Sequence, residues 1–319
     1  MQTAFSHHAS RVREILRDNL PWSQFDFIRN ISTAGDKELQ IEKLTEDIGE
    51  RNDLRFIHKL PGNDELAVFA EKLLWDTHFF GFGIGKLSGI FPLKAPFFRP
   101  SADYTDALRA LIEKARQHDI RYLLAFVDPR DLATLRALGA LGFCLIETRA
   151  YYHMDIRGYD YAERYRVRKA VPEDVEALGN AAREMVNLYD RFHADPFITS
   201  VDADRLMYKW VEASICDKFA DVTIVPDAVK PTAFCTVRYH KDKWPKWKLK
   251  LAQPVFSAVS LEYRGWYRKI ISEINYHLRD MGAEHSFLAT QITNNPVIWV
   301  WESLGYRFGK GEYIFRLVL

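Results

Sequence analysis

Hydrophobic and polar positions recur in distinct blocks along residues 254–306, and these blocks predict five consecutive elements. PVFSAVSL, an apolar and β-branched run that begins at Pro254, is typical of a buried strand. KIISEINYHL carries its isoleucines and leucine at helical spacing, and Gly282 ends the helix. HSFLATQ predicts a second strand, and VIWVWESLG predicts a short helix that Asn294 or Asn295 is expected to cap. The pattern therefore predicts strand, helix, strand, helix, strand.

The same order of blocks occurs earlier in the chain. IRYLLAFVDPRDLATLRALGALGF matches AEHSFLATQITNNPVIWVWESLGY in block order, in glycine placement and in the aromatic residue that follows the last glycine. Residues 119–156 are therefore predicted to form strand, helix and strand, and the similarity indicates a duplicated unit. Upstream, LLWDTHFFGFGIGKLSGI is expected to form a strand, a turn and a second strand. We expect a helical lead-in over 1–65, a partial, degenerate domain over 66–158 and a complete domain over 159–319.

The loop between the first strand and the helix of the C-terminal block has the chemistry of an anion site. It passes through Arg264 and Gly265 directly into the helix. A helix N-terminus presents unpaired backbone N–H groups and the positive end of the macrodipole, and a guanidinium adds a charged fork of donors. The sequence therefore predicts that an anionic group binds here.

Two spaced motifs in this half, V-x-x-E-Y-R-G and N-x-x-V-x-x-V-W-E-S-L-G-Y, resemble the acyl-CoA-binding half of the GNAT acetyltransferase superfamily. The resemblance implies an α/β (α+β) fold of tandem GNAT-like mixed sheets flanked by helices, the C-terminal copy complete and the N-terminal copy partial. It also implies acetyl-CoA (or another acyl-CoA) as cofactor and a small amine as substrate. The cofactor-binding residues that it implies are Val259, Leu261, Arg264, Gly265, Trp266, Tyr267, Arg268, Lys269, Asn294 and Trp301.

The chain departs from the family pattern at two places. The family loop reads R-G-x-G-x-G/A, but Trp266, Tyr267, Arg268 and Lys269 follow Gly265 here, so side chains stand where bare backbone would approach a pyrophosphate. The family often has a tyrosine seven residues after the asparagine, where it protonates the leaving thiolate. This chain has Trp301, whose indole N–H donates a hydrogen bond but is not an acid near neutral pH. We therefore assign no catalytic acid or base.

Three further phrases resemble, in order, the dTDP-fucosamine acetyltransferases, a narrower group within that superfamily. They are W-[DE]-x-x-F-F-G from Trp75, the L-G-F that closes the first copy, and R-F-H-A-D-P from Arg191. This resemblance implies a nucleotide-linked amino sugar as acceptor, with Arg191 and His193 contacting its phosphate or sugar. Each of these features also has a purely structural interpretation. The phrase at Trp75 would be an aromatic hairpin that fills the core, Arg191 would be a surface arginine, and His193 would be a histidine whose hydrogen bonds are made within the protein. The first copy has Asp131 and Leu138 where the second has Asn294 and Trp301, so we interpret it as scaffold.

Composition limits the other possibilities. The 319 residues are 48% hydrophobic, which favours an ordered protein. With 44 basic against 43 acidic residues the chain is close to neutral, so its overall charge does not indicate binding to nucleic acid or to an anionic membrane. KDKWPKWKLK is interpreted as a solvated basic hairpin anchored by its tryptophans. No signal peptide or apolar run of spanning length is evident, so a cytoplasmic location is expected. Three scattered cysteines are expected to be buried thiols, and dispersed histidines predict no metal site.

Two functions from different classes remain open at this point. The first is an acyl-CoA-dependent N-acetyltransferase that acts on a small amine. The second is a non-catalytic, GNAT-derived binding or interaction module whose CoA site is degenerate, because large aromatic rings at 266, 267 and 301 would fold onto apolar surface and fill the cleft. If the strands that begin at Pro254 and His285 separate to leave an open cleft, with Arg264 and the helix N–H groups beside it, the enzyme is favoured. If aromatic rings fill that cleft, the binding module is favoured.

Overall fold

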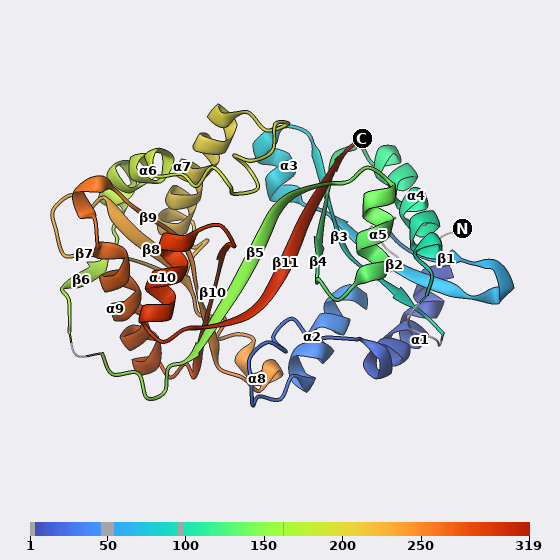
Figure 1. Cartoon of the computed structure of the whole chain (residues 1–319), viewed down its shortest axis with the longest axis horizontal. Coiled ribbons are helices and arrows are strands. Elements are labelled where there is room, and N and C mark those ends of the chain that lie inside the picture. Colours follow the sequence, from blue (N-terminus) through green and yellow to red (C-terminus); the bar gives the residue numbers. More distant parts are fainter. Residues whose placement is uncertain (1–3, 46–53, 95–98, 162) are drawn as a thin grey trace. The chain divides into compact units, whose positions relative to one another are not determined.

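The computed structural model of the chain (Figure 1) describes residues 4–45, 54–94, 99–161 and 163–319. It divides into two compact units. Unit 1 consists of Met1–Thr148 and Gly311–Leu319, and unit 2 consists of Arg149–Lys310. The last residues of the chain thus belong to the unit that its first half forms.

Unit 1 is built on a mixed sheet in the order β1, β2, β3, β4, β11. The β1–β2, β2–β3 and β4–β11 pairs are antiparallel, whereas β3 and β4 are parallel. A helix connects the two parallel strands, as a parallel crossover requires. The strands are β1 (Arg55–Lys59), β2 (Glu65–Lys72), β3 (Gly83–Pro92), β4 (Ile120–Val127) and β11 (Arg307–Val318).

The helices that the described residues of unit 1 form around this sheet are α1 (Ala4–Asn19), α2 (Ala34–Thr45), α3 (Leu74–Phe80), α4 (Ser101–Gln117) and α5 (Leu132–Ala140). The lead-in is part of the same unit, because Leu16 and Ile41 of α1 and α2 share a buried cluster with Phe69 of β2. The lead-in also supplies strand β1. The strand, helix and strand predicted for 119–156 are confirmed as β4, α5 and β5 (Cys144–Asp155).

The predicted hairpin around Trp75 is wrong, because α3 connects β2 to β3. The rings of Trp75 and Phe79 stack with their centroids 5.5 Å apart, as side chains four residues apart do on one face of a helix. Gly81 ends the helix at φ 74°, a left-handed conformation that glycine adopts without strain. The glycines that suggested a turn therefore mark a helix C-terminus.

Unit 2 contains a mixed sheet in the order β5, β10, β9, β8, β7, β6. The β9–β10 pair is parallel, and the β5–β10, β8–β9, β7–β8 and β6–β7 pairs are antiparallel. The strands after β5 are β6 (Val167–Lys169), β7 (Val222–Pro226), β8 (Ala233–Arg238), β9 (Leu251–Val259) and β10 (His285–Gln291). The helices are α6 (Val175–Glu184), α7 (Ser200–Cys216), α8 (Trp244–Trp247), α9 (Trp266–Asp280) and α10 (Asn295–Ser303). The five elements predicted over 254–306 are confirmed as β9, α9, β10, α10 and β11.

The two sheets repeat one pattern of strand directions. β1, β2, β3, β4 and β11 of unit 1 correspond in order and direction to β7, β8, β9, β10 and β5 of unit 2. β11 completes the first sheet, since Tyr313 pairs with Val127 of β4. β5 completes the second, since His153 pairs with Phe287 of β10. The two units therefore share one strand topology, as the predicted duplication requires. The last strand of each sheet comes from the other half of the sequence.

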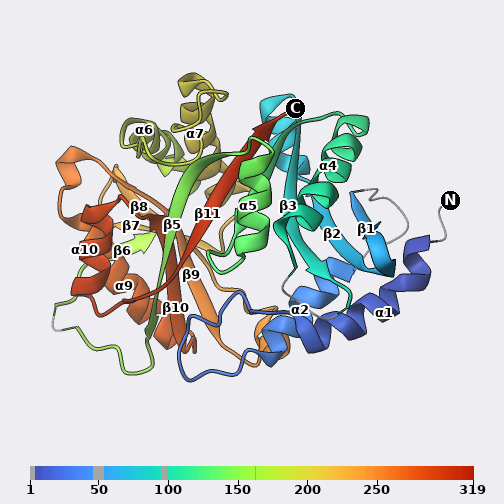
Figure 2. The same ribbon diagram turned by 45° about the vertical axis from the view of Figure 1, so that its right-hand side comes forward.

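Strand periodicity divides the helices of unit 2 between two faces of its sheet. Cys235 of β8 lies in the buried cluster that contains Ile270 of α9 and Trp301 of α10. The adjacent Phe234 points the opposite way, and its neighbour Phe256 stacks on Trp210 of α7 at 5.0 Å. Helices α9 and α10 thus cover one face, where Figure 2 shows them close together, and α7 packs on the other.

The structure corrects the expectation that all three cysteines are buried. Cys144 and Cys216 are exposed, and only Cys235 is buried, where burial raises the pKa of its thiol. Within the described residues, no helix has the length and hydrophobicity needed to cross a bilayer. The same residues contain no cluster of three histidine, cysteine or acidic side chains arranged for a metal ion.

Candidate functional site

The parallel strands β9 and β10 of unit 2 separate soon after they begin. Their described ladder has two pairs, His285 with Leu251 and Ser286 with Ala252. β9 continues to Val259 beside β8 alone, with Ala233 of β8 still opposite Val259 at its end. The edge of β9 that faces β10 is therefore without a strand partner over its second half. Such an edge offers backbone N–H and C=O groups to an extended ligand.

Helix α9 begins at this same end of β9. A single 3-10 turn at Leu261–Tyr263 leads to Arg264, and Gly265 occupies the N-cap position with φ 91°. Glycine suits that backbone, but it supplies no side chain to cap the helix, so the first N–H groups of α9 have no side-chain partner. Arg264 is exposed, and no hydrogen bond or ion pair of its guanidinium is found within the described chain. The loop can therefore bind an anion.

The two other cations of this turn are already engaged. The Arg268 guanidinium donates a hydrogen bond to the Tyr161 hydroxyl and lies 5.3 Å from the centroid of that ring. The Lys269 ammonium lies over two rings, 4.9 Å from Trp266 and 5.2 Å from Tyr165. The ring contacts of Arg268 and Lys269 are cation–π interactions, which hold the two side-chain charges against aromatic faces. Arg264 is the cation of this group that stands exposed.

Tyr267 and Trp301 are in contact in unit 2, where Tyr267 is half-buried against the core and Trp301 is part of it. Trp301 is 2% exposed, and its indole N–H donates to the Tyr267 hydroxyl over 2.7 Å. The Trp301 ring also lies 5.6 Å from that of Tyr152. Burial raises the pKa of Tyr267 far above its ordinary value, so the phenol is neutral at physiological pH. Neither side chain is an acid suited to protonating a thiolate, and the Tyr267 ring occupies a position that is glycine in the family pattern.

The remaining predicted cofactor residues lie around the same strand ends. Val259 is half-buried against the core of unit 2, whereas Leu261 is 80% exposed. The prediction that an asparagine side chain caps α10 is wrong. Asn294 occupies the N-cap position, but its amide instead donates to the Thr290 hydroxyl over 3.0 Å. A proline in the first turn of α10 has no backbone N–H, so one fewer N–H group at this helix end needs a hydrogen-bond acceptor.

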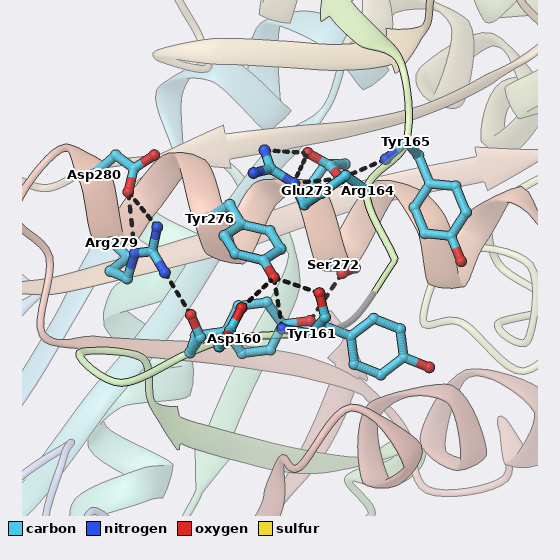
Figure 3. Close-up of polar contacts among 10 residues, drawn as sticks. Asp160, Tyr161, Arg164, Tyr165, Ser272, Glu273, Tyr276, Arg279 and Asp280 are labelled. Atoms are coloured by element: carbon cyan, nitrogen blue, oxygen red, sulfur yellow. Dashed lines mark hydrogen bonds and ion pairs between the residues drawn. The ribbon is translucent and has the colours of Figure 1, made fainter.

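The tyrosine-rich linker packs on α9, which the sequence did not predict (Figure 3). Glu273, which is 5% exposed, accepts hydrogen bonds from Arg164 and from the Tyr165 backbone N–H. The Tyr161 backbone N–H donates a hydrogen bond to the Tyr276 hydroxyl over 2.6 Å. The linker thus fixes the aromatic residues that hold Arg268 and Lys269. The alternation of tyrosines with charged residues in the linker could have indicated this packing. Such side chains can lie along a helix with their apolar parts while their polar ends form hydrogen bonds.

The predicted substrate residues Arg191 and His193 lie in the loop between α6 and α7. The Arg191 guanidinium lies 4.3 Å from the centroid of the Phe192 ring. His193 has both ring nitrogens occupied, Nδ1 by Asp190 at 2.7 Å and Nε2 by Asp204 at 3.2 Å. Burial lowers the pKa of His193, but the two carboxylates outweigh burial and hold the pKa above its ordinary value. His193 therefore joins the loop to α7.

This histidine predicts a pH-dependent contribution to stability. A raised pKa in the folded state means that protonation of His193 stabilises the fold below its unfolded-state pKa of about 6.5, and that this contribution disappears as the pH rises through the folded-state pKa. We expect His193→Asn to lower the free energy of unfolding more at pH 5.5 than at pH 8.5. Urea denaturation of both proteins at each pH measures the difference. An equal loss at the two pH values would contradict the assignment.

Comparisons with known proteins bear on the fold. The chain is similar to a GCN5-related N-acetyltransferase from Sphaerobacter thermophilus, with TM-score 0.61 and 12% identity over 98% of this chain and 93% of the other. It is also similar to a tandem GNAT protein from the clavulanic acid biosynthesis pathway, with TM-score 0.51 and 13% identity over 99% and 96%. A GCN5-related glucosamine N-acetyltransferase region of a fungal multi-domain GH3 β-N-acetylglucosaminidase gives TM-score 0.61 and 11% identity, over 98% of this chain and 37% of the other.

These similarities identify the fold as that of the GNAT acetyltransferases, in its tandem form. No protein-family model matches the chain, and a search of curated proteins finds no similar sequence. Nothing among the comparisons supports the narrower resemblance to the dTDP-fucosamine acetyltransferases. At 11–13% identity the likeness concerns the fold, and the chemistry must be argued from the site.

Proposed function

We propose that the protein is an acyl-CoA-dependent N-acetyltransferase that acts on a small amine in the cytoplasm. The observation that carries this proposal is the separation of β9 from β10 next to the uncapped N-terminus of α9 and the exposed Arg264. Two features needed for an acyl-CoA are thereby adjacent: an unpaired strand edge for an extended amide-bearing arm, and an anion site for phosphate. The tandem GNAT fold agrees with this reading.

Acetyl-CoA fits some of the residues present and would supply an activated thioester. Arg264 and the first N–H groups of α9 would hold its phosphates, and the free edge of β9 would align its arm with the backbone of residues up to Val259. Strand N–H groups polarise a thioester carbonyl, and holding an amine beside it supplies most of what direct transfer requires. The protein need not provide an acid, because a thiol with pKa near 8.5 yields a leaving group of low basicity.

A second candidate function rests on the Tyr267–Trp301 contact. These two rings occupy the positions that are glycine and tyrosine in the family pattern, and their hydrogen bond of 2.7 Å joins α9 to α10. A protein that bound no CoA would lose nothing by filling this space with packed aromatic rings. The alternative is therefore a non-catalytic binding module that retains the fold and the anion site.

Isothermal titration with acetyl-CoA separates the two functions. The enzyme requires saturable binding of acetyl-CoA, together with release of free thiol when an amine is added. Absence of heat at millimolar acetyl-CoA would count against the enzyme and leave the binding module as the better account. Titration with inorganic pyrophosphate then tests whether the anion site alone remains.

Arg264→Ala is expected to weaken acetyl-CoA binding by about five-fold, because one partly exposed charge-assisted contact with phosphate contributes roughly 1 kcal/mol. The loss should shrink at high ionic strength, since salt screens exposed charges. Lys248→Ala is the matched control, an exposed cation that follows α8. Titration of the three proteins at low and high salt gives the comparison. Equal losses in both variants would show that the anion site has been assigned to the wrong loop.

A further inference from the structure

The start of α9 carries positive charge at the end of the helix where a cation is least favourable. Arg268 is the third residue after the N-cap Gly265, Lys269 follows it, and the first turn contains no acidic residue. Because the helix dipole is positive at this end, it opposes cations and favours an anion. The two side-chain charges therefore lie where a bound anion would offset their repulsion by the helix.

The Arg268 side chain can reach the free N–H groups at this helix end. Side chains of a helix tilt toward its N-terminus, and in a capping box the side chain of the third helical residue reaches back to the N-cap. Arg268 occupies that third position of α9. A rotation of its side chain would therefore bring the guanidinium to an anion that the uncapped N–H groups hold.

Tyr161 of the linker holds the guanidinium instead. Arg268 donates a hydrogen bond to the Tyr161 hydroxyl, and its guanidinium carbon lies 5.3 Å from the centroid of that ring. The Arg268 Nε is buried and forms no hydrogen bond within the described residues. A charged donor bonds an ionised oxygen more strongly than a neutral one, and an unsatisfied buried donor is costly. A phosphate oxygen can therefore replace the phenol as the partner of Arg268.

The linker is anchored by bonds that do not involve Arg268 (Figure 3). The Tyr161 backbone N–H donates to the Tyr276 hydroxyl over 2.6 Å. Four residues later, the Tyr165 backbone N–H donates to the Glu273 carboxylate over 2.7 Å. Both acceptors lie on later turns of α9. The linker can therefore stay in place on the helix when the guanidinium leaves the Tyr161 ring.

We propose, on the basis of the anion site in the proposed function, that Tyr161 is a positioning residue: it keeps Arg268 out of the anion site until a ligand with a diphosphate group binds. The ligand then contacts the free N–H groups of α9, Arg264 and Arg268. A ligand shifts such an equilibrium only by its difference in affinity for the two arrangements, so the Arg268–Tyr161 contact is subtracted from the gain on binding. Tyr161 thereby sets the affinity of the site for diphosphates.

Titration of the full chain with inorganic pyrophosphate tests the proposal. Tyr161→Phe removes the hydroxyl acceptor and keeps the ring, so we expect it to tighten pyrophosphate binding by about five-fold. The double variant Tyr161→Phe/Arg268→Gln should bind no more tightly than Arg268→Gln, since the gain depends on the guanidinium. Tyr239→Phe is the matched control, because the Tyr239 hydroxyl also bonds to α9, 2.8 Å from His277 near the other end of the helix. It should leave the affinity unchanged.

Nuclear magnetic resonance of the arginine side chains in the unmutated protein follows Arg268 directly. Its signal is identified by its absence from the spectrum of Arg268→Gln. An aromatic ring shifts the resonances of a group that lies on it. Saturation with pyrophosphate should therefore move the Arg268 signal toward its position in Tyr161→Leu, which has no ring. An Arg268 signal that stays in place while pyrophosphate binds would overturn the proposal.

The remaining outcomes distinguish failure of this proposal from failure of the proposed function. If pyrophosphate binds and moves Arg268 in a protein that does not bind acetyl-CoA, the role of Tyr161 is supported and the acetyltransferase proposal fails. If acetyl-CoA binds and Tyr161→Phe leaves the affinity for pyrophosphate unchanged or weaker, the role of Tyr161 is overturned and the acetyltransferase stands. If pyrophosphate binds to none of these proteins, the role of Tyr161 is overturned together with the anion site.

Discussion

Trp301→Ala is expected to lower the free energy of unfolding by about 3–5 kcal/mol, because it deletes a large ring from a close-packed interior. Trp301 is 2% exposed, lies against Tyr152 and belongs to the main buried cluster of unit 2. Its loss also removes the donor to the buried Tyr267 hydroxyl. Urea denaturation followed by circular dichroism measures the change. The effect should exceed that of any single surface substitution on α10.

Trp299→Ala is the matched control, since Trp299 lies on the same helix and is 64% exposed. We expect it to change the free energy of unfolding by no more than about 0.5 kcal/mol. Trp301→Phe separates the ring from its N–H: most of the packing remains, and the loss should fall to about 1–2 kcal/mol. Similar losses from Trp299→Ala and Trp301→Ala would show that Trp301 is not buried in solution.

Local patterns predicted most of the fold because helices and strands depend on neighbouring residues. Period-two and helical spacing over 119–156 and 254–306 were enough to predict β4, α5, β5 and the elements from β9 to β11. The partners of the last strands were not predictable in the same way. That β11 pairs with β4 and that β5 pairs with β10 depends on contacts between distant segments, to which local periodicity is insensitive.

The error at α3 has a related cause. The segment LLWDTHFFGFGIGKLSGI was predicted to form a strand, a turn and a second strand; the second strand is found as β3, but α3 stands where the first strand and the turn were expected. Trp75 and Phe79 are four residues apart, a spacing that brings two rings together on one face of a helix. For a segment of seven residues, spacing and composition favoured different structures, and only the packed structure distinguishes them.

The candidate site was predictable where it depends on backbone geometry and not where it depends on distant partners. Gly265 before an amphipathic helix predicted an uncapped helix N-terminus, and Arg264 beside it predicted the anion site. Arg268 was predicted to bind the cofactor, but its guanidinium contacts Tyr161, which lies 107 positions earlier in the chain. The helical spacing of α9 gives no information about a linker that folds back over it.

Asn275→Ala is expected to lower the free energy of unfolding by about 2–3 kcal/mol, because it removes one hydrogen-bond partner of a buried phenol and leaves a cavity in the interior. Asn275 on α9 is fully buried, and its side-chain oxygen accepts from the Tyr306 hydroxyl at 2.6 Å. Since a phenol has one proton, the contact of 2.8 Å between Tyr306 and Ser286 must use the Ser286 hydroxyl as donor. Removing the asparagine therefore leaves the Tyr306 hydroxyl with Ser286 as its remaining partner among the described residues and leaves a cavity where the amide was buried.

A double-mutant cycle tests this account. Tyr306→Phe removes the other half of the pair, so the combined Asn275→Ala/Tyr306→Phe variant should lose less stability than the sum of the two single variants, by about 1 kcal/mol or more. Urea denaturation at one pH provides all four values. Asp280→Ala, an exposed position at the end of the same helix, should cost no more than about 1 kcal/mol. Strictly additive losses in the cycle would mean that Asn275 and Tyr306 are not coupled, and that the polar network between α9 and β10 does not form in solution.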